Sequence, residues 1–236
     1  MNAAAAQRRL RSLANPAQAA FHSRYFKTGP GEYAEGDQFL GVKVPETRRV
    51  VREFRALPLA DVKKLLRSPW HEERLLALLI LVSQFEKADD EGRAKIYRLY
   101  LANIERINNW DLVDTTAPNI VGAYLHDKPR QPLYELAKSA SLWERRIAII
   151  ATAAFIRANE FSDTLKIARL LLHDREDLIH KAVGWMLREV GQRDREALET
   201  FLQRHYRSMP RTMLRSVIEK FPEPQRLLYL RGRMTP

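Results

Sequence analysis

Four tryptophans, Trp70, Trp110, Trp143 and Trp185, constrain the fold more than any other feature, because they are separated by 40, 33 and 42 residues. Each one opens a segment with helix-like spacing of apolar residues. Helical repeats of the HEAT and armadillo type have periods of about 40 to 47 residues, and one repeat cannot bury its apolar face without a neighbour. We therefore expect an all-α fold, a curved superhelical solenoid of HEAT-like antiparallel helix pairs, that forms one domain over residues 1–236.

The composition agrees with one continuous core and excludes several classes of protein. The chain has 236 residues, of which 45% are hydrophobic and 29% are charged. Its longest apolar run, residues 75–82, is well short of the roughly 18 residues that span a bilayer, and the N-terminus lacks the apolar stretch of a secretory signal. We expect a cytoplasmic protein. The absence of cysteine excludes disulfides, thiolate catalysis and cysteine-ligated metals.

The histidines and the glycine-rich segment favour no cofactor. The six histidines include no pair at i and i+4 and no H-E-x-x-H pattern, so we expect no zinc site and no other metal. Residues 27–38 contain glycines and a lysine, but not in the order that binds a nucleotide phosphate. We expect this segment to be a loop.

The formal net charge of +11 is typical of proteins that meet phosphate groups. A basic surface that is merely solvated would have the same net charge, so charge alone leaves both interpretations open.

Helix start and stop signals recur along the chain. Ser68 and Pro69 predict an N-cap and a first helical residue, with Glu72 and Glu73 in the positive first turn. Further helices are predicted to begin near Pro45, at a capping box of Ser141 and Glu144, and at Asp174, the last of them closing at Gly191.

The segment NNWDLVD, residues 108–114, contains the first candidate site residues. Helical spacing places one buried stripe on residues 112, 113, 116, 120 and 123. Trp110 and Asp114, one turn apart, lie together on a different face. A carboxylate that only stabilises the helix N-terminus is the alternative interpretation, although Asp111 already provides one. Pro118 predicts either a kink beside Asp114 or a loop boundary.

The segment KAVGWMLREVG, residues 181–191, contains the second group. Ile179, Val183, Met186 and Val190 form its buried stripe, whereas Lys181, Trp185 and Arg188 lie on the opposite side. An indole between two cations suits a surface that meets sugars, bases and phosphates. A tryptophan that is buried between two layers of helices is the structural alternative.

Five segments together resemble one family. They are residues 24–49 (RYFKTGPGEYAEGDQFLGVKVPETRR), 108–114, 143–149 (WERRIAI), 180–191 (HKAVGWMLREVG) and 209–222 (MPRTMLRSVIEKFP). Over nearly its whole length the chain resembles the AlkD-like DNA glycosylases, all-helical HEAT-like repeat proteins that excise alkylated purines. The resemblance implies a DNA repair enzyme that meets DNA at the nucleoid.

The resemblance also assigns residues. It implies that Asp114 is the catalytic carboxylate, that Trp110 and Trp185 are the site tryptophans and that Arg146 is the site arginine. The tyrosine near the entry falls on Tyr25. Lys43 stands where the family pattern has a neutral glutamine, and a cation at this position suits contact with phosphate. We expect Lys43, Arg48, Arg49, Lys181 and Arg188 to contact the phosphates of DNA.

The implied chemistry needs one carboxylate. An N3- or N7-alkylated purine is cationic, so it departs without the general acid that ordinary glycosides require. Asp114 would stabilise the oxocarbenium-like sugar and position water. The resemblance implies no metal and no cofactor. It also implies a monomer that acts on double-stranded DNA containing alkylated bases. No second acidic group is evident on this face. A non-catalytic helical-repeat scaffold that binds nucleic acid or protein is the alternative.

Overall fold

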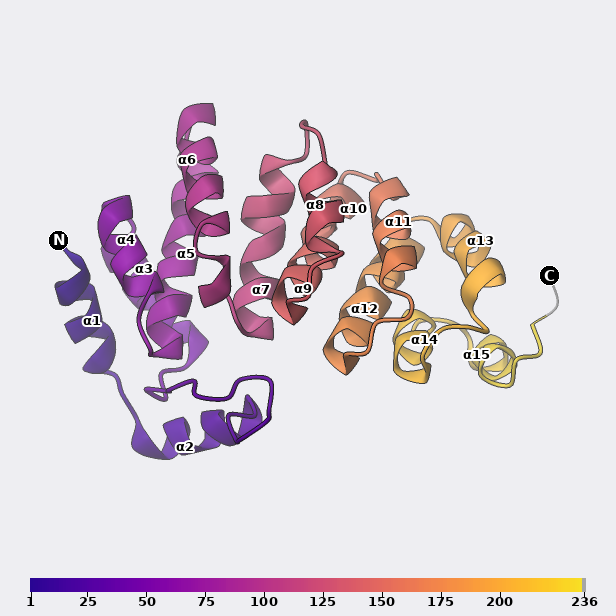
Figure 1. Cartoon of the computed structure of the whole chain (residues 1–236), viewed down its shortest axis with the longest axis horizontal. Coiled ribbons are helices and arrows are strands. Elements are labelled where there is room, and N and C mark those ends of the chain that lie inside the picture. Colours follow the sequence, from indigo (N-terminus) through magenta and orange to yellow (C-terminus); the bar gives the residue numbers. More distant parts are fainter. Residues whose placement is uncertain (235–236) are drawn as a thin grey trace. The chain divides into compact units, whose positions relative to one another are not determined.

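The computed structural model describes residues 1–234, and within them the regular secondary structure is helical, apart from an isolated bridge between Gln38 and Trp70. The predicted all-α class is confirmed (Figure 1). Contacts divide the chain into two compact units, Met1–Ile120 and the part from Val121 onward. The solenoid arrangement and the single domain stay predictions.

Unit 1 is built around one helix that is buried on all sides. Its elements are α1 (Ala3–Arg11), α2 (Pro16–Tyr25), α3 (Val44–Phe54), α4 (Leu59–Leu66), α5 (His71–Lys87), α6 (Asp90–Leu101), the 3₁₀ turn η1 (Ile104–Arg106) and α7 (Trp110–Ala117). Every residue of α5 from His71 to Leu81 is buried, and α5 packs against α3, α4, α6 and α7 (Figure 1). A helix that is apolar around its circumference requires such neighbours.

The start of α5 differs from the prediction. The helix begins at His71 with Trp70 as N-cap, not at Pro69, and the Ser68 hydroxyl accepts the backbone N–H of Trp70 at 3.1 Å. Glu72 and Glu73 do lie in the first turn, but both are buried. Their partners are parts of the chain that lie far away in sequence.

The end of α7 shows a second difference. A π-helical turn, η2 (Pro118–Gly122), follows α7, so Pro118 marks an irregular turn where the sequence predicted a kink or a boundary. A π turn adds a residue and rotates all later positions of the helix by about 100°. Leu112, Val113 and Ile120 are buried as predicted, whereas Ala123, beyond the π turn, is exposed.

Unit 2 surrounds a second long helix. Its elements are α8 (Gln131–Leu136), α9 (Leu142–Ala151), α10 (Ala153–Arg157), α11 (Ser162–Leu170), α12 (Asp177–Arg193), α13 (Arg195–His205), α14 (Arg211–Val217) and α15 (Glu223–Leu230). Helix α12 packs against α9, α10, α11, α13 and α14 (Figure 1). The predicted N-cap is confirmed at Ser141, whose hydroxyl accepts the N–H of Glu144 at 3.5 Å.

The predicted limits of α12 are wrong at both ends. The helix begins at Asp177 instead of Asp174, and it continues through Gly191 to Arg193. The Asp174 carboxylate instead accepts from the Arg145 guanidinium at 2.6 Å and from the N–H of Glu176 at 2.9 Å. A Cβ at position 191 would approach the Leu198 side chain at 2.2 Å, so Gly191 serves close packing against α13 and does not terminate the helix. Trp185 therefore lies in the middle of a helix, unlike the other three tryptophans.

In the part of the chain that the structure describes, no helix combines the length and apolarity that crossing a membrane demands.

Candidate active site

Helix α7 presents Trp110 and Asp114 together. The Asn109 side chain caps the helix by accepting the N–H of Trp110 at 2.8 Å, which fixes where the helix starts. Because Leu112 and Val113 are buried, the residues one turn apart on the other side stay partly exposed. The face predicted for Trp110 and Asp114 is therefore the face that the structure gives them.

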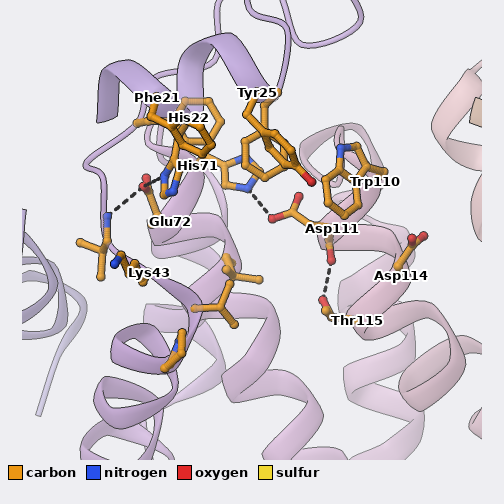
Figure 2. A pocket seen from close by; sticks show the side chains of 16 residues that line it. Phe21, His22, Tyr25, Lys43, His71, Glu72, Trp110, Asp111, Asp114 and Thr115 are labelled. Carbon is orange, nitrogen blue, oxygen red and sulfur yellow. Dashed lines mark hydrogen bonds and ion pairs between the residues drawn. The ribbon is translucent and has the colours of Figure 1, made fainter. Parts of the chain in front are cut away.

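Both residues line a pocket of about 440 Å³ within unit 1 (Figure 2). This is a usual size for a small-molecule site. Its other lining residues come from α2, the loop between α2 and α3, the start of α3, the start of α5 and α7 itself. They are Phe21, His22, Tyr25, Phe26, Phe39, Val42, Lys43, Val44, Pro45, His71, Glu72, Leu75, Asp111 and Thr115. Tyr25 and Lys43, expected at the site, are thus brought together with Trp110 and Asp114.

Aromatic rings form most of the pocket wall. The Trp110 ring stacks on Phe26, with centroids 5.3 Å apart, and meets Tyr25 edge-on at 6.0 Å. The Tyr33 phenol forms a hydrogen bond with the Trp110 side chain. Phe21 and Tyr25 stack on each other at 5.9 Å and are about half exposed (51% and 55%). The rings of α2 therefore offer π faces to a ligand at the mouth of the pocket.

A buried ionic network lies beneath this wall. His71 Nε2 donates to Asp111 Oδ2 at 2.8 Å (Figure 2). On the other side of the ring, His71 Nδ1 faces Asp37 Oδ2 at 3.4 Å. The Arg74 guanidinium donates to Asp37 Oδ1 at 2.8 Å. Burial by itself would lower the pKa of His71, but Asp111 and Asp37 outweigh it and raise the pKa to about 9. His71 is therefore an imidazolium between two carboxylates at neutral pH.

The same network lowers the pKa of Asp37. Burial opposes ionisation of this carboxyl, whereas the hydrogen bond with His71 and the charge of Arg74 favour the carboxylate and prevail. Asp37 thus stays charged and holds His71, and His71 in turn holds Asp111 at the first turn of α7. The backbone that carries Trp110 and Asp114 is thereby fixed to α5.

Glu72 binds the opposite wall of the pocket. Its carboxylate accepts the backbone N–H groups of Leu40, Gly41 and Val42 at 2.9, 2.8 and 3.2 Å. Gly41 has φ +79°, and a Cβ there would approach the Asn15 carbonyl at 2.1 Å, so only glycine fits this loop. Glu72 therefore positions the loop that leads into Lys43.

Sequence reasoning missed His71 and Glu72 as parts of the site. The available signal was the quartet HEER, residues 71–74, since four polar side chains begin a helix that is otherwise apolar. All four are buried, and a buried charged group requires partners. The sequence does not say which residues those partners are.

The expectation that no second acidic group lies on this face is wrong, because Asp111 and Glu72 also line the pocket. Both are committed to other groups, Glu72 to three backbone N–H groups and Asp111 Oδ2 to His71. Among the described residues, Asp111 Oδ1 is buried and lacks a hydrogen-bond partner. Asp111 Oδ2 accepts the hydrogen bond of the His71 imidazolium, so this side chain acts as a hydrogen-bond acceptor here.

Asp114 lies close enough to Tyr100 to act on its ionisation. Burial raises the pKa of the Tyr100 hydroxyl, its hydrogen bond with Thr116 lowers it in part, and the negative charge of Asp114 raises it further. Tyr100 thus stays a neutral phenol at neutral pH. Its hydroxyl lies 3.1 Å from the Thr116 hydroxyl, and the side chain is fully buried.

The expected phosphate-binding cations of unit 1 follow the pocket along α3. Lys43 is the exposed N-cap of α3, and its N–H donates to the Glu46 carboxylate at 3.2 Å. Arg48 and Arg49 are exposed one turn beyond Val44 and Pro45, so they continue the rim of the pocket. Among the described residues neither arginine forms a salt bridge.

The remaining expected site residues lie in unit 2. Arg146 is buried on α9, and its guanidinium donates to the carbonyl of Leu178. Trp185 is partly exposed on α12, and its indole N–H donates to the Glu189 carboxylate at 3.1 Å. On the same face Lys181 pairs with Asp177 at 2.6 Å and Arg188 pairs with Glu219. The predicted buried stripe of α12, Ile179, Val183, Met186 and Val190, is confirmed.

Comparisons with known proteins agree on one description. A family model described as "DNA alkylation repair enzyme" matches residues 6–221. The chain is similar to a solved structure described as "Predicted DNA alkylation repair enzyme from Enterococcus faecalis", with a TM-score of 0.69 and 17% identity over 89% of this chain and 97% of that chain. At this identity the likeness shows a shared fold. No curated protein matches the sequence.

Proposed function

Because the chain belongs to the DNA alkylation repair enzyme family, we propose that it is a DNA glycosylase that hydrolyses the N-glycosidic bond of cationic N3- and N7-alkylated purines in duplex DNA. One observation carries this proposal. Trp110 and Asp114 lie one turn apart in a pocket walled by aromatic rings, on a helix whose other face is buried. A scaffold has no need of a carboxylate held in such a pocket.

Asp114 is the group that acts on the sugar. As the bond to the cationic base breaks, positive charge moves to the deoxyribose, and a fixed carboxylate stabilises that charge. Asp114 also positions the water that attacks the sugar. Glu72 and Asp111 already accept hydrogen bonds, from three backbone N–H groups and from His71, so neither is placed as the acid for the base. The leaving group then departs as a base that is already activated by its own charge.

The tryptophans supply contact with the lesion. Trp110 stacks on Phe26 and forms a hydrogen bond with Tyr33, so it offers a rigid π surface. Cation–π attraction to an alkylated base is worth roughly 0.5 to 2 kcal/mol. We propose Trp185 and Arg146 as further site residues. We also propose that the chain forms a single domain of HEAT-like helix pairs. The protein acts as a monomer and uses neither metal nor cofactor.

DNA is held mainly through its phosphates. Lys43, Arg48 and Arg49 extend from the pocket along α3, and Lys181 and Arg188 provide further cations on α12. Such contacts fix the position of the duplex without reading its sequence. Selection then depends on the charge of the base.

The release of free methylpurine from methylated duplex DNA tests the proposal. We expect Asp114→Asn to fold and bind DNA as the wild type does, but to release base about 10²- to 10³-fold more slowly. Asp90→Asn removes an exposed carboxylate of α6 in the same unit and is the matched control, with unchanged release. Normal release by a folded Asp114→Asn variant would exclude Asp114 from the mechanism, and no release by the wild type would favour the non-catalytic scaffold.

Matched duplexes that contain N7-methylguanine or uracil test the selectivity. We expect release of the cationic base and almost none of the neutral one, because Glu72 and Asp111 are engaged as hydrogen-bond acceptors and the proposed role of Asp114 is to stabilise the sugar. Similar rates on both duplexes would identify a general acid, with the Lys43 ammonium as the first candidate, and would contradict the electrostatic mechanism.

A further inference from the structure

A second hollow lies within unit 2 and shares no lining residue with the pocket of unit 1. It has a volume of about 210 Å³ and lies between α11 and α13. Its lining residues are Leu165, Lys166 and Arg169 from α11, and Ala197, Thr200, Phe201, Arg204 and His205 from α13. We call this hollow the α11–α13 groove.

The charge of the α11–α13 groove has one sign. Lys166, Arg169 and Arg204 line it and are exposed, and no carboxylate is among its lining residues. Among the described residues none of these three cations forms a salt bridge. Other arginines of unit 2 are paired with carboxylates, among them Arg130 with Asp163 at 2.7 Å. Asp163, one turn before Lys166 on α11, interacts with the Lys166 charge from outside the groove, whereas among the described residues Arg169 and Arg204 have no such carboxylate. The groove therefore gathers cations without a salt-bridge partner.

The pKa of His205 reflects the excess of positive charge around the groove. Burial lowers the pKa of this histidine, and the positive charges of Arg169 and Arg204 and the neighbouring His173 lower it further. The charged groups that act on His205 are all basic. A positive potential in a partly enclosed hollow attracts an anion.

The shape and chemistry of the groove suit a phosphate that ends a chain. Apolar side chains of Leu165 and Phe201 form part of the lining, and the Thr200 hydroxyl is a hydrogen-bond donor beside the cations. A terminal phosphate carries about −1.5 to −2 charges and three acceptor oxygens, whereas a phosphodiester carries one charge. Three cations match the terminal group better, and arginine binds it through paired N–H donors.

We propose that the α11–α13 groove is a binding site for a terminal phosphate group, either that of a small phosphate ester or that of a phosphorylated nucleic-acid end. The site uses neither Asp114 nor the pocket of unit 1. It therefore stands or fails independently of base release.

Histidine ring signals in the NMR spectrum of the full chain test this site directly. Inorganic phosphate is titrated at constant ionic strength, with chloride as the replaced anion. We expect a saturable shift of the His205 ring signal, while the ring signal of His126, which does not line the groove, stays in place. The absence of a saturable His205 shift would overturn the proposal.

Single substitutions then separate a site from general charge. We expect Arg169→Gln and Arg204→Gln each to weaken phosphate binding about tenfold, which corresponds to about 1.4 kcal/mol. Arg175→Gln is the matched control, because Arg175 is an exposed arginine of the same unit outside the groove. Because these side chains are exposed, we expect all three variants to fold. Equal affinity for phosphate in all three would also overturn the proposal.

Competition identifies the source of the phosphate. A short single strand with a 5′-phosphate is compared with the same strand bearing a 5′-hydroxyl, and each competes with inorganic phosphate at His205. Competition by the phosphorylated strand alone supports a nucleic-acid end as ligand. Competition by neither strand, with phosphate itself bound, supports a small phosphate ester. Equal competition by both strands would mean that internal phosphodiesters suffice, and it would overturn the preference for a terminal group.

Discussion

Helices α7 and α12 each present a tryptophan and charged side chains, but they hold them in different ways. Around α7 the supports are buried: His71 between Asp111 and Asp37, and Glu72 on three backbone N–H groups. On α12 the supports are surface pairs, such as Lys181 with Asp177. Removing one partner of a buried ion pair lowers the free energy of unfolding by about 3 to 5 kcal/mol, whereas a surface ion pair contributes only about 0 to 1 kcal/mol. Unit 1 therefore fixes its geometry, and the charged groups of α12 are free to exchange partners.

The substitution His71→Gln should give the largest effect. It leaves Asp37 and Asp111 buried without their shared cation, and we expect the free energy of unfolding to fall by about 3 to 5 kcal/mol. Urea unfolding at pH 7 measures it. His126→Gln in unit 2 is the control, since the imidazole of His126 is 44% exposed and its pair with Glu160 is at the surface, so we expect a change below about 0.5 kcal/mol. Equal effects would remove the contrast between the two regions.

The free energy of unfolding should depend on pH because His71 is charged between Asp37 and Asp111. The pKa of His71 is raised to about 9, so its stabilisation is fully present below its unfolded pKa of about 6.5 and is lost as pH rises through 9. We expect a loss of about 3 kcal/mol between pH 6 and pH 9.5. Urea unfolding across this range measures it, and His71→Gln should abolish this part of the slope. A wild-type stability that does not change over this range would contradict a buried imidazolium.

Removal of the Glu72 charge should have a smaller effect. Glu72→Gln weakens three hydrogen bonds to backbone N–H groups, and we expect a loss of about 2 kcal/mol in the free energy of unfolding. Glu219→Gln is the matched change in unit 2, since Glu219 is 48% exposed and pairs with Arg188, and it should cost less than about 1 kcal/mol. If Glu72→Gln is as mild as Glu219→Gln, the loop before α3 is held by other contacts.

The smallest effects concern the phosphate contacts. We expect Arg48→Gln to reduce the slope of log affinity against log salt by about 0.9, which corresponds to one phosphate. Lys181→Gln should change the slope less, because Lys181 must first leave Asp177. Titration of a labelled duplex at several salt concentrations measures both. A larger change for Lys181 would mean that the ion pairs of α12 already open in the complex.

Local periodicity predicted the helices and one face of the site. The buried stripes of α7 and α12 follow from spacing alone, as does the common face of Trp110 and Asp114. The prediction failed for Ala123, where the π turn after Pro118 changes the angular position of later residues. Such a turn is not encoded in a 3.6-residue period.

The supports of the site could not be predicted, because they join residues far apart in sequence. The sequence predicts that Glu72 stabilises the N-terminus of its own helix, but its carboxylate binds backbone about 30 residues away. Asp37 stands in the glycine-rich loop and contacts His71 across 34 positions. Pairing at this distance is decided by packing, which no local signal in the chain reports.

Helix α2 has a consequence for motion. It carries Phe21 and Tyr25 at the mouth of the pocket, yet none of its residues is buried. Segments with little buried apolar area open with much less free energy than global unfolding requires. The amide hydrogens of α2 should therefore exchange with solvent long before those of α5, while the Trp110 side of the pocket stays closed. One wall of the pocket is rigid, and the other can yield to the size of the molecule that enters.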